Sequence, residues 1–322
     1  MTQTRSETQV QTRPETSWDP KENNWRPPTH LPPGDPVVTE SGVRRYEGLT
    51  YAATAGYRPC LLDVAVPAGD GPAPVVVWIH GGAWQDGDRR YPPPTVTPEL
   101  LFGGILDAGL ALVSIDYRHS LEAPFPAQLH DAKSAVRYLR HYSRVLGIDP
   151  ERIGVWGESA GGHLTALLAL TPSDDPDHPL EGSVGITGPS SAVRAAVDWY
   201  GVSNVPSLLS TLHELPPPGA AHRPDPCEAL LGGRPEQWPL LARSASPLTY
   251  ADHVAAPLLL QHGTKDTVVP HEHSAQLAAR LAACGSEVTL RSIPDADHCF
   301  VGLADIAPVV HEGITFLERH LG

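Results

Sequence analysis

Six strand-like runs alternate with helical patterns from residue 75 onward. The runs are 75–80, 111–116, 152–156, 195–199, 257–261 and 288–293, and most are continuously apolar, as expected of strands covered on both faces. Helices are predicted between and after them, over 125–146, 160–170, 271–284 and 307–321. This alternation predicts an α/β fold with a mostly parallel central sheet, flanking helices and right-handed crossovers.

The pattern is less regular in two other parts of the chain. Residues 1–36 are polar and Pro-rich and predict a loosely attached arm, whereas short strand-like runs between 37 and 66 predict an antiparallel hairpin or meander. The alternation also stops at about 203–250, where Pro and Gly cluster. We expect one catalytic domain over 37–322, with a lid-like insertion at 203–250 over the carboxyl ends of the strands.

Composition and charge exclude several classes of protein. With 23 Lys and Arg against 37 Asp and Glu, the net charge of −14 disfavours a nucleic-acid partner, because an acidic surface repels phosphates. No apolar run approaches the ~20 residues of a membrane-spanning helix. Met1–Asp19 has no apolar segment typical of a secretory signal, and the four cysteines form no CxxC pair, so we expect reduced thiols and a cytoplasmic location. The triplet His271–Glu272–His273 lacks the spacing of a helical zinc site, so no metal or other cofactor is expected.

The sequence Gly157–Glu158–Ser159–Ala160–Gly161 fits the motif G-x-S-x-G. It lies between a predicted strand and a predicted helix, which is the context of a nucleophile elbow, where glycines two positions from the serine permit a sharp turn. The start of the helix would also place free N–H groups beside the reacting oxygen. We therefore predict Ser159 as a catalytic nucleophile. The alternative is a packing turn in which the serine caps the helix.

A second glycine motif, HGGAW at residues 80–84, directly follows a predicted strand. Backbone N–H groups exposed at a strand end can bind the negative oxygen of a tetrahedral intermediate. We expect the N–H groups of Gly81, Gly82 and Ala160 to form an oxyanion hole, and His80 to orient the loop. The alternative is an ordinary Gly-rich turn.

A serine nucleophile needs a base and an acid, which in this type of fold follow it in the order Ser, Asp, His. Asp266 follows the predicted strand 257–261, and His298 follows 288–293. Both side chains are therefore expected at the carboxyl edge of the sheet, together with Ser159. We predict Asp266 as the acid and His298 as the base, because His262 lies too close to the acid in sequence to be the base.

Together HGGAW, DYR, APFPAQLHD, GESAGG and GTKDTVVP followed by DADH resemble the α/β-hydrolase superfamily, and more narrowly its esterase and lipase branch. They are similar to hormone-sensitive-lipase-like, feruloyl-esterase-like and kynurenine-formamidase-like enzymes. The resemblance covers about residues 45–320 and implies Ser159 as nucleophile, Asp266 as acid and His298 as base. HGGAW departs from the HGGG of hormone-sensitive-lipase-like members and is closer to the HGG-x-W of the other two groups.

These observations predict a serine-dependent carboxylic ester hydrolase that acts on small or medium, fairly apolar esters through an acyl-enzyme. Trp84, Trp199 and Tyr200 are expected to line the substrate pocket, with core packing as the alternative for Trp84. An amidase such as an arylformamidase, a peptidase, or a non-catalytic ligand-binding protein on the same fold are the alternatives in function. Dimers are common among the resembling enzymes, so a homodimer is one expected assembly.

Overall fold

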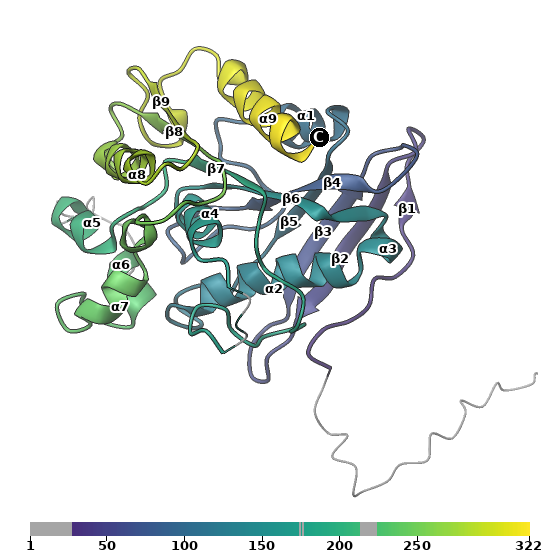
Figure 1. Cartoon of the computed structure of the whole chain (residues 1–322), viewed down its shortest axis with the longest axis horizontal. Helices are drawn as coiled ribbons and strands as arrows, with labels where there is room; N and C mark the ends of the chain where they lie inside the picture. Colours follow the sequence, from purple (N-terminus) through teal and green to yellow (C-terminus); the bar gives the residue numbers. More distant parts are fainter. Residues whose placement is uncertain (1–27, 174, 176, 213–223) are drawn as a thin grey trace, which may run out of the picture.

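A nine-stranded sheet lies at the centre of the described part of the chain (Figure 1). The computed structural model describes residues 28–173, 175, 177–212 and 224–322. In spatial order the strands are β1 (Val37–Val38), β2 (Arg44–Ala52), β3 (Cys60–Val66), β5 (Ala111–Ile115), β4 (Ala73–Ile79), β6 (Ile148–Glu158), β7 (Ala195–Trp199), β8 (Leu258–Gly263) and β9 (Val288–Ile293). Each strand-like run of the sequence corresponds to one of these strands.

The sheet has an antiparallel part and a parallel part. The strands β1, β2, β3 and β5 pair antiparallel, whereas β5, β4, β6, β7, β8 and β9 pair in parallel. Alternate residues of β4 pack into two hydrophobic cores. Val75, Val77 and Ile79 belong to one core, and Val76 and Trp78 belong to the other. A strand that is covered on both faces needs a continuous apolar sequence, which is the pattern predicted for this one.

Helices cover both faces of the sheet. The helices α2 (Ala127–His141), α4 (Ala160–Leu170) and α8 (Glu272–Ala283) contribute to one core, and α1 (Gly104–Asp107) and α9 (Ala307–Leu321) to the other (Figure 1). A π-helix, Glu99–Gly103, precedes α1 and was not predicted. The helix predicted over 125–146 is interrupted at Tyr142, after which α3 (Ser143–Leu146) follows.

Short helices occupy the region of the predicted insertion, between β7 and β8. They are α5 (Val205–Leu212), α6 (Pro226–Leu231), α7 (Pro239–Ser244) and the 3-10 helix Pro247–Tyr250. The Gln85 side-chain amide donates to the carbonyl of Pro224 at 3.0 Å, and the Phe125 N–H donates to the carbonyl of Leu230 at 2.7 Å. These bonds attach α6 and the residues before it to loops at the carboxyl ends of β4 and β5.

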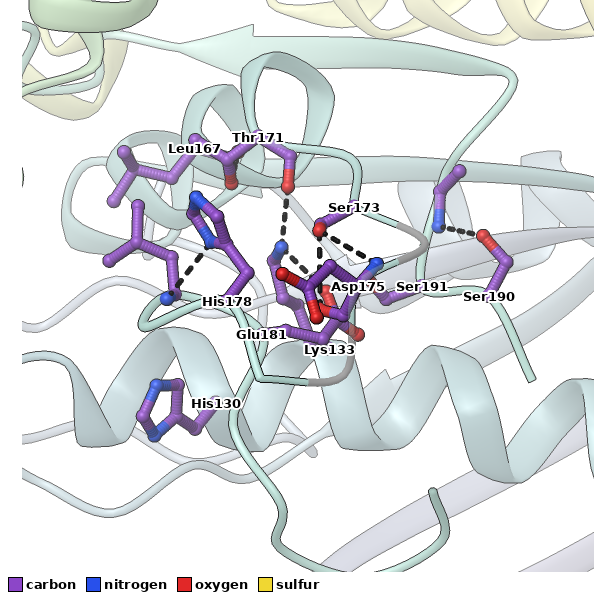
Figure 2. Close-up of polar contacts among 12 residues, drawn as sticks. His130, Lys133, Leu167, Thr171, Ser173, Asp175, His178, Glu181, Ser190 and Ser191 are labelled. Atoms are coloured by element: carbon purple, nitrogen blue, oxygen red, sulfur yellow. Dashed lines mark hydrogen bonds and ion pairs between the residues drawn. The ribbon is translucent and has the colours of Figure 1, made fainter. Parts of the chain in front are cut away.

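A buried ionic cluster of Lys133, Arg137 and Glu181 fastens α2 to the segment between α4 and β7. Lys133 Nζ donates to Glu181 Oε2 at 2.9 Å and to the carbonyl of Thr171 at 2.5 Å, as Figure 2 shows. Arg137 Nη1 donates to Glu181 Oε1 at 2.6 Å. No side chain of the cluster is more than 6% exposed. Both carboxylate oxygens therefore have a cationic partner, as a buried charge requires.

The predicted arm, residues 1–36, lies largely outside the described residues. Its described end is bound to the body: the Leu31 N–H donates to the carbonyl of Thr50 at 2.9 Å, and the Tyr138 hydroxyl donates to the carbonyl of Leu31 at 2.8 Å. Among the described residues, no helix combines the length and the apolar character needed to cross a membrane.

Candidate active site

Ser159 occupies the sharp turn between β6 and α4. Its backbone lies at φ 53° and ψ −115°, a conformation that is costly for any residue with a side chain. A Cβ at Gly157 would collide with the backbone of Gly161, and a Cβ at Gly161 would collide with the carbonyl of Ile79. Only glycine fits these two positions, so the motif read from the sequence builds the turn that presents the serine hydroxyl.

Three side chains from three loops meet at the carboxyl edge of the sheet. His298 Nε2 lies 3.1 Å from Ser159 Oγ, and His298 Nδ1 lies 2.8 Å from Asp266 Oδ2. Because a carboxylate only accepts hydrogen bonds, the proton of the neutral ring is on Nδ1, and Nε2 accepts from the serine hydroxyl. The structure thus brings together the three residues predicted as the triad, which lie 139 and 32 positions apart in the chain.

Asp266 has more partners than His298 alone. Its Oδ1 accepts from the N–H groups of Val268 at 2.9 Å and Val269 at 2.8 Å, and His262 Nε2 lies 3.2 Å from its Oδ2. Burial acts to raise the pKa of this carboxyl, but the hydrogen bonds from His262 and His298 outweigh it and hold the pKa well below its usual range. From its sequence position His262 is only a competing base, and its contact with Asp266 arises from the fold.

The prediction for the oxyanion loop is wrong at Gly81. Its N–H donates to Glu158 Oε1 at 2.8 Å in a buried contact, so a side chain already engages it. The N–H groups of Gly82 and Ala83 have no hydrogen-bond partner within the described part of the chain, and both residues line the cleft at the nucleophile. Ala160 is the first residue of α4, where N–H groups lack partners inside the helix.

The three residues predicted to line the pocket lie in the core instead. Trp84 is 1% exposed, and Trp199 and Tyr200 are fully buried. Trp199 Nε1 donates to Gln261 Oε1 at 2.7 Å, and the Tyr200 ring packs edge-to-face against His298 at 4.8 Å. None of the three is among the residues that line the cleft. Their rings complete the hydrophobic cores beneath the sheet edge, so core packing accounts for them.

Trp84 ties the loop after β4 to the helix α4. Its indole N–H donates to His163 Nδ1 at 3.1 Å, so the proton of the neutral imidazole is on Nε2, which donates to the carbonyl of Ala245 at 2.6 Å. Burial lowers the pKa of His163 to about 4, which keeps the ring neutral. Because His163 belongs to α4 and Ala245 follows α7, one imidazole connects the loop, the helix and the insertion.

A cleft of about 790 Å³ opens over Ser159. Besides the serine, the histidine and the glycine loop, its lining includes Asp86, Asp88, Tyr91, Pro92–Pro94, Val268 and Cys299. Burial raises the pKa of the Cys299 thiol to about 12, so this thiol does not compete as a nucleophile. Within the described residues, no group of three or more His, Cys, Asp or Glu side chains is arranged to hold a metal ion.

A mostly parallel sheet that carries a strained serine turn, an aspartate and a histidine at its carboxyl edge defines an α/β-hydrolase. Comparison with known families gives the narrower assignment. The BD-FAE family model matches residues 62–281, which is more than half of the chain, and the chain belongs to this family.

Several known proteins are similar to this chain. Esterase LipQ of Mycobacterium tuberculosis is 33% identical over 229 residues, which are 71% of this chain and 50% of LipQ. Carboxylesterase NlhH of the same organism is 28% identical over 312 residues, which are 92% of this chain and 86% of NlhH. The structure of a truncated carbohydrate esterase from gut microbiota has a TM-score of 0.70 and 27% identity over 90% of this chain and 100% of its own. The chain spans about half the length of LipQ.

Proposed function

We propose that this chain hydrolyses carboxylic esters, with small or medium, fairly apolar esters as its substrates. The observation that supports this most is the relay from Ser159 through His298 to Asp266, with contacts of 3.1 and 2.8 Å at the floor of an open cleft. The names of the relatives, esterase and carboxylesterase, support the same class of reaction.

The reaction follows from the direction of these hydrogen bonds. Ser159 Oγ attacks the acyl carbonyl while its proton passes to His298 Nε2, and Asp266 stabilises the imidazolium that forms. The imidazolium then protonates the leaving alcohol, and the acyl group stays on the serine. Water gives a proton to the same histidine and attacks the acyl carbon; the imidazolium then returns that proton to Ser159 Oγ as the acyl–oxygen bond breaks and the acid leaves.

The negative oxygen of each tetrahedral intermediate is bound, in this proposal, by the N–H groups of Gly82, Ala83 and Ala160. Gly81 acts indirectly, because its N–H holds the Glu158 carboxylate and so fixes the loop against the nucleophile turn. The insertion at 203–250 is proposed as a lid, supported by its attachment to the loops after β4 and β5. A homodimer and a cytoplasmic location stay predictions of the sequence.

A phosphonate ester tests the nucleophile directly. Treatment with a p-nitrophenyl phosphonate should abolish the turnover of p-nitrophenyl acetate, and mass spectrometry should find one adduct, on the peptide that holds Ser159. An adduct on Ser203 or Ser286 would contradict the assignment. Binding of the acetate ester without turnover would favour a ligand-binding protein, and faster cleavage of the matching anilide would favour an amidase.

Acyl groups carried on a carbohydrate are a second candidate class of substrate. One similar solved structure is described as a carbohydrate esterase. In this chain the cleft presents the Tyr91 ring, which is 62% exposed, and the carboxylates of Asp86 and Asp88. The Arg90 guanidinium packs on that ring at 5.6 Å and restricts its orientation. Both carboxylate oxygens of Asp88 already accept from Arg90, whereas the exposed ring offers an apolar face and a polar hydroxyl, which suit a ligand rich in hydroxyl groups.

The variant Tyr91→Ala tests this second candidate. It should raise KM for an acetylated xylo-oligosaccharide by about fivefold, since such a ring contact contributes roughly 1 kcal/mol, and leave KM for p-nitrophenyl acetate unchanged. Tyr57→Ala is the matched control, because Tyr57 is also exposed, at 41%, but lies outside the cleft. An equal change for both substrates would count against a carbohydrate subsite.

A further inference from the structure

The catalytic acid lies between two histidines. Asp266 Oδ2 is 2.8 Å from His298 Nδ1 and 3.2 Å from His262 Nε2. His262 is the penultimate residue of β8 and is fully buried. The turn after β8 folds back, so that the carboxylate four positions later returns to this imidazole. The hydrolytic mechanism described above assigns no role to His262.

Hydrogen bonds fix the tautomer of His262. Its Nε2 faces two acceptors, the carbonyl of Val269 at 2.8 Å and Asp266 Oδ2 at 3.2 Å, so Nε2 carries the proton. Its Nδ1 lies 2.7 Å from the hydroxyl of Ser274 on α8, which can donate to it. The ring is therefore held from both sides: its N–H donates to the Val269 carbonyl at the shorter distance, and Asp266 Oδ2 lies beside the same N–H.

We propose that His262 is a positioning residue of the triad: its Nε2–H, shared between the Val269 carbonyl and Asp266 Oδ2, draws part of the carboxylate's charge away from His298 and so sets the pH at which the base becomes active. This inference rests on the proposed function. Since His262 does not touch the reacting atoms, it acts only through the aspartate.

The expected direction of the effect follows from the sharing of charge. A carboxylate oxygen that accepts two N–H groups divides its interaction between them. Without the His262 donor, more of the charge acts on His298 and favours the imidazolium, which cannot serve as a base. Asp266 stays in place, because its Oδ1 still accepts from Val268 and Val269. The acid limb of the kcat/KM profile should therefore move to higher pH.

Other titratable groups surround both histidines and are left unchanged in the test. Those near His262 are Asp198 and Tyr200, at the end of β7, and His271 and His273, at the start of α8. Those near His298 are Glu158, Tyr200, Asp297 and Cys299. In the described structure none of these side chains donates a hydrogen bond to Asp266, so a shift that follows the His262 donor alone can be assigned to it.

The test compares the pH dependence of kcat/KM for p-nitrophenyl acetate in four proteins. In His262→Leu the midpoint of the acid limb should rise by about 0.5 to 1 pH unit, the equivalent of one hydrogen bond, with the plateau within about tenfold of wild type. His262→Gln keeps an amide N–H donor and should keep the wild-type midpoint. The control His273→Leu removes a buried histidine that binds the N–H groups of Ser203 and Asn204, and it should not move the midpoint. A midpoint in His262→Leu that stays in place or falls, or an equal rise in the control, overturns the proposal.

A measurement on the wild-type protein covers the case in which leucine prevents folding. The measurement is an NMR spectrum of the wild-type protein with nitrogen-15-labelled histidine. The ring signals of His262 are identified as those that are absent from the spectrum of His262→Gln. They should show a proton on Nε2 and none on Nδ1. A proton on Nδ1 overturns the proposal. This measurement needs no turnover, so a protein with the expected tautomer but no esterase activity would contradict the proposed function and not the contact.

Discussion

Two clusters of polar side chains lie in this fold, one between α2 and the segment before β7 and one at the carboxyl edge of the sheet, and they differ in what their atoms face. In the ionic cluster, Lys133 and Arg137 bind both oxygens of Glu181 at 2.6 to 2.9 Å, and no side chain is more than 6% exposed. In the triad, the ring of His298 is 16% exposed, and Ser159 opens onto the cleft. The first cluster is satisfied within the fold and holds a helix in place, whereas the second leaves a hydroxyl for a ligand. Buried polarity alone therefore does not mark a functional site in this fold.

The largest difference between the two clusters should appear in turnover. Ser159→Ala should lower kcat for p-nitrophenyl acetate by at least ~10⁴-fold, because it removes the nucleophile. The melting temperature should stay close to that of wild type, since the hydroxyl makes one hydrogen bond, to His298. Ser286→Ala is the matched control, because it removes a half-buried hydroxyl that lies outside the cleft and contacts Ala255 and His253. Activity near the wild-type level in Ser159→Ala would mean that the triad is not the catalytic centre.

The opposite outcome is expected for the ionic cluster. Glu181→Ala leaves two buried cations without a carboxylate and should lower the free energy of unfolding by about 3–5 kcal/mol, with kcat of the folded protein unchanged. Glu287→Ala is the control, because its pair with Arg319 is exposed on both sides, and it should cost less than ~1 kcal/mol. Urea unfolding measures both. A stable Glu181→Ala protein, or a folded one with reduced kcat, would remove the distinction between the clusters.

A buried histidine outside both clusters, His163, should make the stability of the protein depend on pH. Its ring lies between Trp84 and Ala245. Burial lowers its pKa from 6.5 to about 4. Between these pH values the unfolded chain binds a proton that the folded chain does not bind, so the free energy of unfolding falls as the pH falls. The loss contributed by this histidine is roughly 3 kcal/mol.

The variant His163→Gln isolates this contribution. Its amide can accept from Trp84 and donate to Ala245 without titrating, so its stability should depend less steeply on pH across the same window. Urea unfolding of both proteins at several pH values makes the comparison. Parallel curves for wild type and variant would show that His163 is not held neutral by its neighbours.

The smallest effect is expected at Glu158, whose carboxylate accepts from the Gly81 N–H at the wall of the cleft. In Glu158→Gln the amide oxygen can still accept from the Gly81 N–H, so kcat should fall by no more than about tenfold. Glu158→Ala leaves that N–H without an acceptor and should lose more. Measured kcat and KM values of the two variants test this order. A larger fall in kcat for Glu158→Gln than for Glu158→Ala would indicate that the charge of Glu158 itself has a role.

Much of the fold could be predicted because strands covered on both faces have continuous apolar sequences. The run 75–80 is an example, since β4 serves two cores. The members of the triad could be predicted for a related reason: the carboxyl ends of parallel strands meet at one edge, so residues after β6, β8 and β9 converge there.

Details that depend on individual contacts could not be predicted in the same way. HGGAW indicates that N–H groups are available, but not that Glu158 occupies the one at Gly81. Trp84 could line a pocket or fill a core on its sequence alone, and only its bond to His163 decides between these. His262 was set aside because it is close to Asp266 in sequence, yet a tight turn makes that closeness a contact.

The left-handed backbone at Ser159 has a consequence for how this protein would evolve. Any side chain at that position costs about 1–3 kcal/mol, which glycine would avoid. Selection of variants for thermal stability alone is therefore expected to enrich Ser159→Gly. Such variants would have a higher melting temperature and no hydrolytic activity. Screens for thermostable variants of this chain should keep a selection for turnover at every round.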